Sequence, residues 1–254
     1  MLIEIKKHGP WRCLSNPRQQ DWVRDLPEIP ELLGNLKSLP KTLKDNHRSL
    51  VLLGDLSGKH LVAKQPRDKN RRLWARVLSY FEQTEASQTL STLERFHELG
   101  ISSVQPLFVL EKRVLGAVVD SWLCYEYRDG TPCNEFCVPG IIGMLRKMHL
   151  VGFRHNDPNL GNFLIDENDE MFVLDSRGRK RSGNFSDAND FFLFKKINKT
   201  ITDFQVSDVE HLDSTTLGYR LAFVYTKIKS ARSFLKDKVR KTRSKNTEQD
   251  KNKY

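Results

Sequence analysis

The segment HNDPNLGNF, residues 155–163, is the densest cluster of polar residues in the chain and decides how the fold is interpreted. Asn, Asp, Pro and Gly favour turns, so this segment is expected to be a loop. The preceding run GIIGMLRKMHLV, residues 140–151, has the apolar spacing of a helix. Asp157 and Asn162 stand five residues apart, so one loop can present a carboxylate and an amide to one ligand. An ordinary surface loop is the alternative interpretation.

A second carboxylate follows at a suggestive distance. Asp175 comes thirteen residues after Asn162 and directly after the apolar run MFVL, which predicts a short hairpin strand. The pattern H-x-D-x-x-x-x-N has the spacing of the catalytic loop of protein kinases, and Asp175 stands where their second magnesium ligand stands. We therefore predict Asp157 as catalytic base, with Asn162 and Asp175 holding Mg²⁺ on ATP.

Two upstream residues complete the predicted phosphate site. The strand-like run LVAK, residues 61–64, ends in Lys64, which is expected to contact the α- and β-phosphates of ATP. Residues 73–99 have helical periodicity, and Glu82, Glu85 and Glu94 are candidates to hold this lysine. We choose Glu85, because it stands near the middle of the predicted helix. Taken singly, Lys64 and Glu85 read as solvated surface residues.

The adenine is expected at a hinge formed by CYEY, residues 124–127, where the backbone of Glu126 would bind the base. A glycine-rich phosphate loop is absent, because DNHR, residues 45–48, stands between the first two predicted strands of the kinase-like region. Backbone amides or Arg48 would then contact the phosphates. This departure keeps a non-catalytic kinase-like protein open as an alternative.

The wider pattern predicts an α+β, two-lobed, protein-kinase-like fold. Residues 41–127 are expected to form a small lobe with a five-stranded antiparallel sheet and one helix, and residues 128–235 a mostly helical lobe. Prolines at 10, 17, 27, 30 and 40 predict an N-terminal extension over residues 1–40. Residues 236–254 are expected to be a basic, disordered tail.

The composition indicates which classes of partner and which compartment are expected. The 254 residues carry a formal net charge of +10, which favours an anionic partner. Four cysteines without C-x-x-C spacing and no signal-peptide core favour the cytoplasm. No apolar run is long enough to span a bilayer, so membrane contact is expected to be peripheral. Nucleic acid is not expected, because no recognised reading motif accompanies the basic residues.

With these residues in hand, the sequence resembles the lipopolysaccharide core heptose kinases, especially the heptose(II) kinases, within the protein-kinase-like superfamily. The resemblance is sharpest over DPNLGNF (157–163), FVLDSRGRK (172–180) and LGYRLAFVYTKIKSARSFLKDKVRK (217–241). It implies phosphorylation of a heptose hydroxyl by ATP at the cytoplasmic face of the inner membrane of a Gram-negative bacterium. Asn156 and Ser176-Arg177 depart from the residues usual in protein kinases.

The C-terminal segment suggests how such a protein would meet the membrane. Residues 227–254 contain eleven Lys or Arg against three acidic residues. An apolar stripe that includes Leu221, Val224 and Ile228 runs along the predicted last helix, and such a helix can lie on anionic lipid. Packing of its first half on the helical lobe is the alternative.

Three rival functions remain. Another sugar or small-molecule kinase, for example one acting on the keto-octulosonic acid of the core, differs only in its acceptor. A pseudokinase would bind without Mg²⁺-dependent turnover of ATP. A basic binding protein would act through charge alone.

Overall fold

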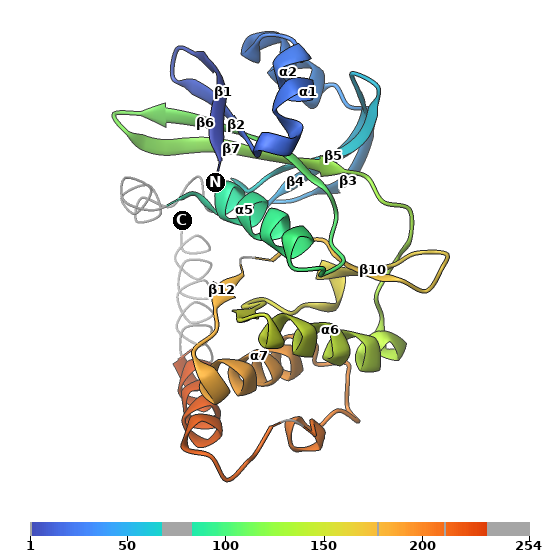
Figure 1. The fold of residues 1–254 in the computed structure, drawn as a ribbon, viewed down its shortest axis with the longest axis vertical. Helices are drawn as coiled ribbons and strands as arrows, with labels where there is room; N and C mark the ends of the chain where they lie inside the picture. The colour runs from blue at the N-terminus through green and yellow to red at the C-terminus, as the bar shows by residue number, and fades with distance from the viewer. Residues whose placement is uncertain (1, 68–82, 177, 211, 233–254) are drawn as a thin grey trace, which may run out of the picture.

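The fold is an α+β arrangement built on one large antiparallel sheet, as the computed structural model describes it for residues 2–67, 83–176, 178–210 and 212–232 (Figure 1). The strand order is β1-β2-β6-β7-β5-β4-β3, and every neighbouring pair is antiparallel. Its strands are β1 (Ile3–His8), β2 (Trp11–Ser15), β3 (Lys41–Asp45), β4 (Leu50–Leu56), β5 (Lys59–Gln65), β6 (Pro106–Val114) and β7 (Ala117–Glu126).

Both faces of the sheet are covered. In β7, Trp122 and Cys124 belong to a core shared with α1 (Gln20–Asp25) and α2 (Ile29–Lys37), whereas Leu123 packs with Leu90 of α5 (Glu85–Glu98). Successive residues of a strand point to opposite faces, so this alternation places α1 and α2 on one face and α5 on the other. Figure 1 shows the same arrangement.

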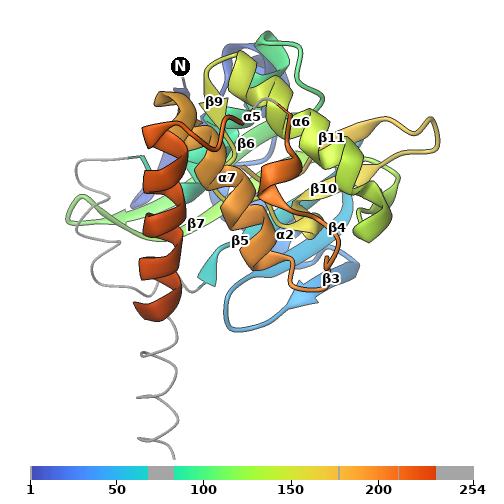
Figure 2. The same ribbon diagram turned by 90° about the horizontal axis from the view of Figure 1, so that it is seen from below.

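A second core lies beyond α5. It joins Phe96 of α5 to α6 (Val138–Leu150) and α7 (Gly183–Ile197), with Leu145 and Phe191 fully buried. The helix over residues 217–232 packs beside α7, as Figure 2 shows. The remaining strands are short: β8 (Thr131–Pro132), β9 (Phe153–Arg154), β10 (Phe163–Ile165), β11 (Met171–Val173) and β12 (Arg179–Lys180). The 3-10 turns are η1 (Pro17–Gln19), η2 (Glu135–Cys137), η3 (Leu160–Asn162) and η4 (Val206–Asp208).

The predicted strands and the helix over residues 140–151 are confirmed, but the sheet has seven strands where five were predicted. The additional two, β1 and β2, come from the first 40 residues and extend the sheet beyond β6. Pro10 lies in the turn between β1 and β2, and Pro17 follows β2, so neither proline interrupts the ladder. The domain limits at residues 41, 128 and 236 stay a prediction.

The helix predicted over residues 73–99 does not run continuously. Residues 68–82 lie outside the described residues, and residues 83 and 84 are not helical. Thr84 is extended and its hydroxyl accepts a hydrogen bond from the N–H of Ser87, which starts α5 at Glu85. Glu85 is therefore the first residue of its helix, and its expected position near the middle is wrong. The predicted stop at Gly100 is confirmed, since this glycine takes the left-handed φ of 71° after α5.

Within the described residues, no helix has both the length and the apolar character needed to cross a membrane.

A buried carboxylate ties the N-terminal hairpin to the sheet. Glu111 of β6 is fully buried and accepts hydrogen bonds from Arg12 of β2, at 2.6 Å, and from the hydroxyls of Thr84 and Ser87, each at 2.6 Å. Burial raises the pKa of Glu111, but these donors outweigh burial and hold that pKa below its usual range. Its ionised form therefore stabilises the folded state above the unfolded pKa of about 4.3.

We predict that Glu111→Ala lowers the free energy of unfolding by about 3 kcal/mol at pH 7, because it leaves Arg12 without its buried partner. In wild type, stability is lost as the pH falls from about 4.3 through the lower folded pKa, and Glu111→Gln flattens this acid limb. Urea denaturation between pH 3 and 7 measures both effects. Glu167→Ala, at an exposed position, is the control. Equal stability of the two alanine variants would contradict the assignment.

Candidate active site

The loop that carries Asp157 is held from beneath by Asp190, a fully buried residue of α7. Its carboxylate accepts hydrogen bonds from the backbone N–H groups of His155, at 2.6 Å, and Asn156, at 3.0 Å. The ring of His149, on α6, lies 3.2 Å from the same carboxylate. Asn156 takes a left-handed φ of 70°, which asparagine adopts more readily than most residues. Asn156 therefore suits the backbone conformation that it adopts here.

The other end of the loop is held by amide side chains. Asn198 accepts from the N–H of Leu160, at 3.1 Å, and donates to the carbonyl of Pro158, at 3.0 Å. The amide nitrogen of Asn162 donates to the carbonyl of Asp157, at 2.8 Å. These bonds fix the loop at both ends, so Asp157 and Asn162 have defined relative positions.

The β10–β11 hairpin brings Asn162 next to Asp175. Phe163 pairs with Val173, and the N–H of Leu174 donates to the carbonyl of Asn162 at 2.9 Å. Asn162 and Asp175 thus flank the open end of one antiparallel pair, thirteen residues apart in the chain. The predicted hairpin strand before Asp175 is confirmed as β11.

Lys64 reaches Asp175 from the sheet. The ammonium group of Lys64, in β5, forms an ion pair with the carboxylate of Asp175, which lies 3.5 Å from the hydroxyl of Thr89 on α5. Burial lowers the pKa of Lys64, but the carboxylates of Asp175 and Glu85 and the nearby Tyr125 outweigh burial and raise it. Lys64 therefore stays protonated throughout the physiological pH range.

Four of the six predicted site residues are thus linked in one place: Lys64, Asp157, Asn162 and Asp175. Glu85 lies close enough to raise the pKa of Lys64, but the hydrogen-bonded carboxylate partner of the lysine is Asp175. The expectation that Glu85 holds Lys64 stays a prediction.

The backbone N–H groups of the predicted hinge are already bonded to carbonyl groups of the protein. Glu126 forms an ion pair with Lys59, and its backbone N–H donates to the carbonyl of Gln105 at 2.9 Å. The N–H of Tyr127 donates to the carbonyl of His60, also at 2.9 Å. An adenine bound here would have to use carbonyl oxygens, or N–H groups farther along the chain. Adenine binding by the backbone of Glu126 therefore stays a prediction.

The turn between β3 and β4 is closed by a side chain. The amide oxygen of Asn46 accepts from the N–H groups of Arg48, at 2.9 Å, and Ser49, at 3.0 Å. These two amides are therefore already bonded within the turn. Of the two contacts expected here for phosphate, the guanidinium of Arg48 is the better supported.

The side chains of Asn162 and Asp175 are suitable ligands for Mg²⁺. Magnesium is commonly held by one or two protein oxygen ligands together with phosphate oxygens and water. The amide nitrogen of Asn162 is engaged, which leaves the amide oxygen as its ligand atom. No group of three or more His, Cys, Asp or Glu side chains gathers as a metal site within the described ranges.

The sequence interpretation missed the residues that position this site. Asp190, Asn198 and Thr89 all contact it, and none belongs to the motif that was recognised. A signal for Asp190 existed, because SDAND, residues 186–190, places two carboxylates directly before the apolar run FFLF. Acidic residues at buried helix positions need partners, and for Asp190 these are the N–H groups of His155 and Asn156.

Comparison with known proteins gives matches at the level of structure. One solved structure that resembles this chain is WaaP in complex with acyl carrier protein. The match has a TM-score of 0.46 and 14% sequence identity, and it covers 86% of this chain and 97% of that one. No protein-family model and no curated protein sequence matches the chain.

We predict that Asp190→Ala lowers the free energy of unfolding by about 2 to 4 kcal/mol, because it leaves buried N–H groups without an acceptor. Asp190→Asn keeps one acceptor oxygen and should lose less. Thermal and urea denaturation measure the change, and amide hydrogen exchange at His155 and Asn156 should speed up.

The control is Asp203→Ala, which removes an exposed carboxylate bonded to the adjacent Thr202 hydroxyl at 2.9 Å. If Asp190→Ala were as stable as this control and exchange at residues 155 and 156 were unchanged, Asp190 would not hold the loop.

Proposed function

We propose that this protein transfers the γ-phosphoryl group of ATP to a sugar hydroxyl, with a two-lobed, protein-kinase-like arrangement of the sheet and the helices. The observation that carries the proposal is the convergence of Lys64, Asp175, Asn162 and Asp157 from three separate segments of the chain. Phosphoryl transfer needs a cation on the phosphates, a metal site and a base for the acceptor, and these side chains supply that set.

Each residue has one chemical task in the proposed reaction. The ammonium of Lys64 binds ATP phosphate oxygens and the carboxylate of Asp157 orients the acceptor hydroxyl. The hydroxyl oxygen forms a bond to the γ-phosphorus, and the bond from that phosphorus to the β–γ bridging oxygen breaks. ADP leaves, and the hydroxyl proton goes to Asp157.

Magnesium would be held by Asn162 and Asp175 and, when bound, would neutralise charge on the phosphate oxygens. Asp175 would therefore contact both Mg²⁺ and the ammonium group of Lys64. The ion pair with Lys64 holds the carboxylate of Asp175 near the sheet.

For the acceptor, we propose a heptose of the lipopolysaccharide inner core. The support is the resemblance over residues 157–163, 172–180 and 217–241, together with the net charge of +10, which suits an anionic glycolipid. Another core sugar, such as the keto-octulosonic acid, is the nearest alternative. A pseudokinase or a basic binding protein is less favoured, because the residues for catalysis are present and connected.

The location that fits this acceptor is the cytoplasmic face of the inner membrane. The basic C-terminal segment would contact anionic lipid there. Within its described part, Leu221, Val224 and Ile228 are each about half exposed on one helix that also carries Lys227 and Lys229, a pattern typical of interfacial helices. Residues 233–254 lie outside the described residues.

We predict that wild type transfers label from γ-labelled ATP, in the presence of Mg²⁺, to core lipopolysaccharide that lacks its native phosphates. Asp157→Asn should lower the rate at least about 100-fold, because general base catalysis contributes about 10² to 10⁴. Asp175→Asn should lower it similarly and raise the Mg²⁺ requirement.

The control is Asp169→Asn, the same change on the tip of the β10–β11 hairpin, where the left-handed φ of 58° suits asparagine. Its rate should equal that of wild type. Full activity of Asp157→Asn would show that the base is wrongly assigned, and no labelling of any core acceptor by folded wild type would favour the pseudokinase.

A further inference from the structure

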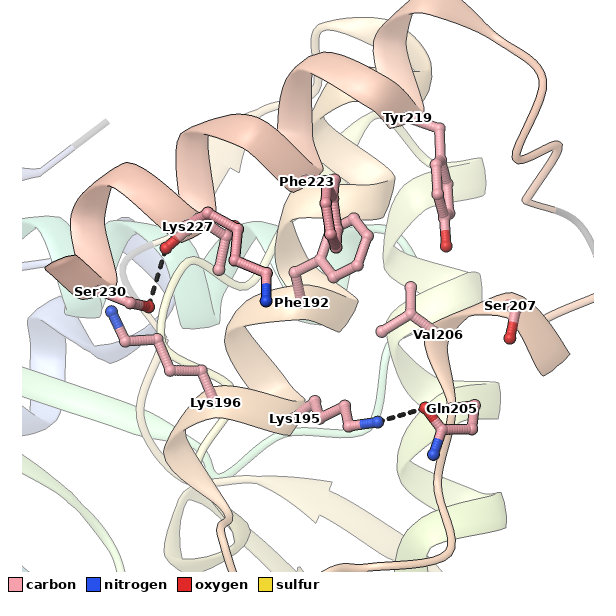
Figure 3. A pocket seen from close by; sticks show the side chains of 11 residues that line it. Phe192, Lys195, Lys196, Gln205, Val206, Ser207, Tyr219, Phe223, Lys227 and Ser230 are labelled. Carbon is pink, nitrogen blue, oxygen red and sulfur yellow. Dashed lines mark hydrogen bonds between the residues drawn. The ribbon is translucent and has the colours of Figure 1, made fainter.

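A pocket of about 570 Å³ lies between α7, the η4 turn and the helix over residues 217–232 (Figure 3). Its volume falls within the range of about 300–1,000 Å³ typical of small-molecule sites. None of the candidate active-site residues lines it. The pocket is therefore a separate feature of the molecule.

One wall of this pocket is aromatic. The ring of Phe192, from α7, lies 5.2 Å from that of Tyr219 and 5.6 Å from that of Phe223, measured between centroids. Phe223 is 45% exposed although it belongs to this cluster. An open apolar wall of this kind is suited to an alkyl chain, since covering it removes apolar surface from water.

The rim of the pocket is cationic. Lys195 and Lys196 come from the last turn of α7, and Lys227 comes from the facing helix (Figure 3). None of the three forms an ion pair with a carboxylate of the described chain; Lys195 instead donates to the side chain of Gln205. Burial lowers the pKa of Lys196, and the ammonium groups of Lys229 and Lys199 lower it further.

Two lysines at the end of a helix also have an ordinary explanation, because they interact favourably with the helix dipole. Lys227 does not share it, since it lies in mid-helix on the other side of the pocket, with its ammonium 5.3 Å from the centre of the Phe223 ring. Cations thus converge from two helices beside an apolar wall. A bound negative charge would offset their mutual repulsion.

We propose that this pocket binds one anionic phospholipid, with an acyl chain against Phe192, Tyr219 and Phe223 and the phosphate among Lys195, Lys196 and Lys227. A free phosphate would leave the aromatic wall unused, and a neutral lipid would leave the cations unused. A phospholipid with net negative charge satisfies both surfaces. This binding does not depend on phosphoryl transfer.

The test uses the full chain and dihexanoyl phosphatidylglycerol below its critical micelle concentration, so that no bilayer surface is present. Isothermal titration calorimetry should show saturable binding at least about tenfold tighter than that of dihexanoyl phosphatidylcholine or inorganic phosphate, a difference well within the resolution of affinity measurements. Equal binding of the choline lipid would overturn the role of the lysines. Equal binding of inorganic phosphate would overturn the role of the aromatic wall.

Variants locate the site. Thr226→Phe fills the pocket without removing a cation and should abolish binding, and Lys195→Gln/Lys196→Gln/Lys227→Gln should weaken it about tenfold. The charge-matched control is Lys7→Gln/Lys37→Gln/Lys147→Gln, at three exposed positions. Phe223→Ser should weaken binding, whereas Leu221→Ser, exposed on the same helix and outside the pocket lining, should not.

Wild-type affinity in Thr226→Phe would place the lipid elsewhere and overturn the proposal. Asp157→Asn should bind the lipid like wild type. Loss of phosphoryl transfer and loss of lipid binding are therefore separately observable.

Discussion

The ion pair between Lys64 and Asp175 is the contact on which the candidate site depends. Lys64 belongs to the seven-stranded sheet, and Asp175 follows a short hairpin on the helical side of the molecule. Both side chains are about one-quarter exposed or less, so water could not fully compensate either charge if its partner were missing. The pair joins the cation proposed for ATP phosphates to the carboxylate proposed for Mg²⁺, and it orients one against the other before any nucleotide binds. Preorganisation of this kind is what phosphoryl transfer requires of a protein.

Buried acids with backbone or hydroxyl partners hold the rest in place. Asp190 fixes the loop that carries Asp157, and Glu111 ties the N-terminal hairpin to β6 and α5. Each is fully buried, so each would be costly alone and is stabilising only because its acceptor oxygens are satisfied. The same α5 that packs on the sheet supplies Thr89 to Asp175 and Phe96 to the second core. Helix α5 therefore connects the sheet, Asp175 and the second core through packed and hydrogen-bonded contacts.

The spacing of apolar residues in the sequence predicted those elements whose formation depends on neighbouring residues. The strands β3 to β7, the helix α6 and the hairpin before Asp175 follow from period-two and helical spacing, and the linkage of Lys64, Asp157, Asn162 and Asp175 follows from their order along those elements. The pattern did not reveal β1 and β2, because short strands beside prolines resemble an extension until their partner β6 is known. The start of α5 was misplaced, since a threonine cap inside a long apolar periodicity is a weak signal. Asp190 and Asn198 were missed because their partners are backbone groups about forty residues away, which no local spacing indicates.

We propose that this arrangement is a nucleotide site that uses magnesium, and binding of ATP tests this without reference to any acceptor. Isothermal titration calorimetry of the full chain with ATP, in the presence and absence of Mg²⁺, is the most direct measurement. We predict saturable binding that is much stronger with Mg²⁺ and that weakens when Lys64 is replaced by methionine. A folded protein that binds no ATP under either condition, or binds it equally with and without Mg²⁺, would show that Lys64, Asn162 and Asp175 do not form a magnesium-dependent nucleotide site.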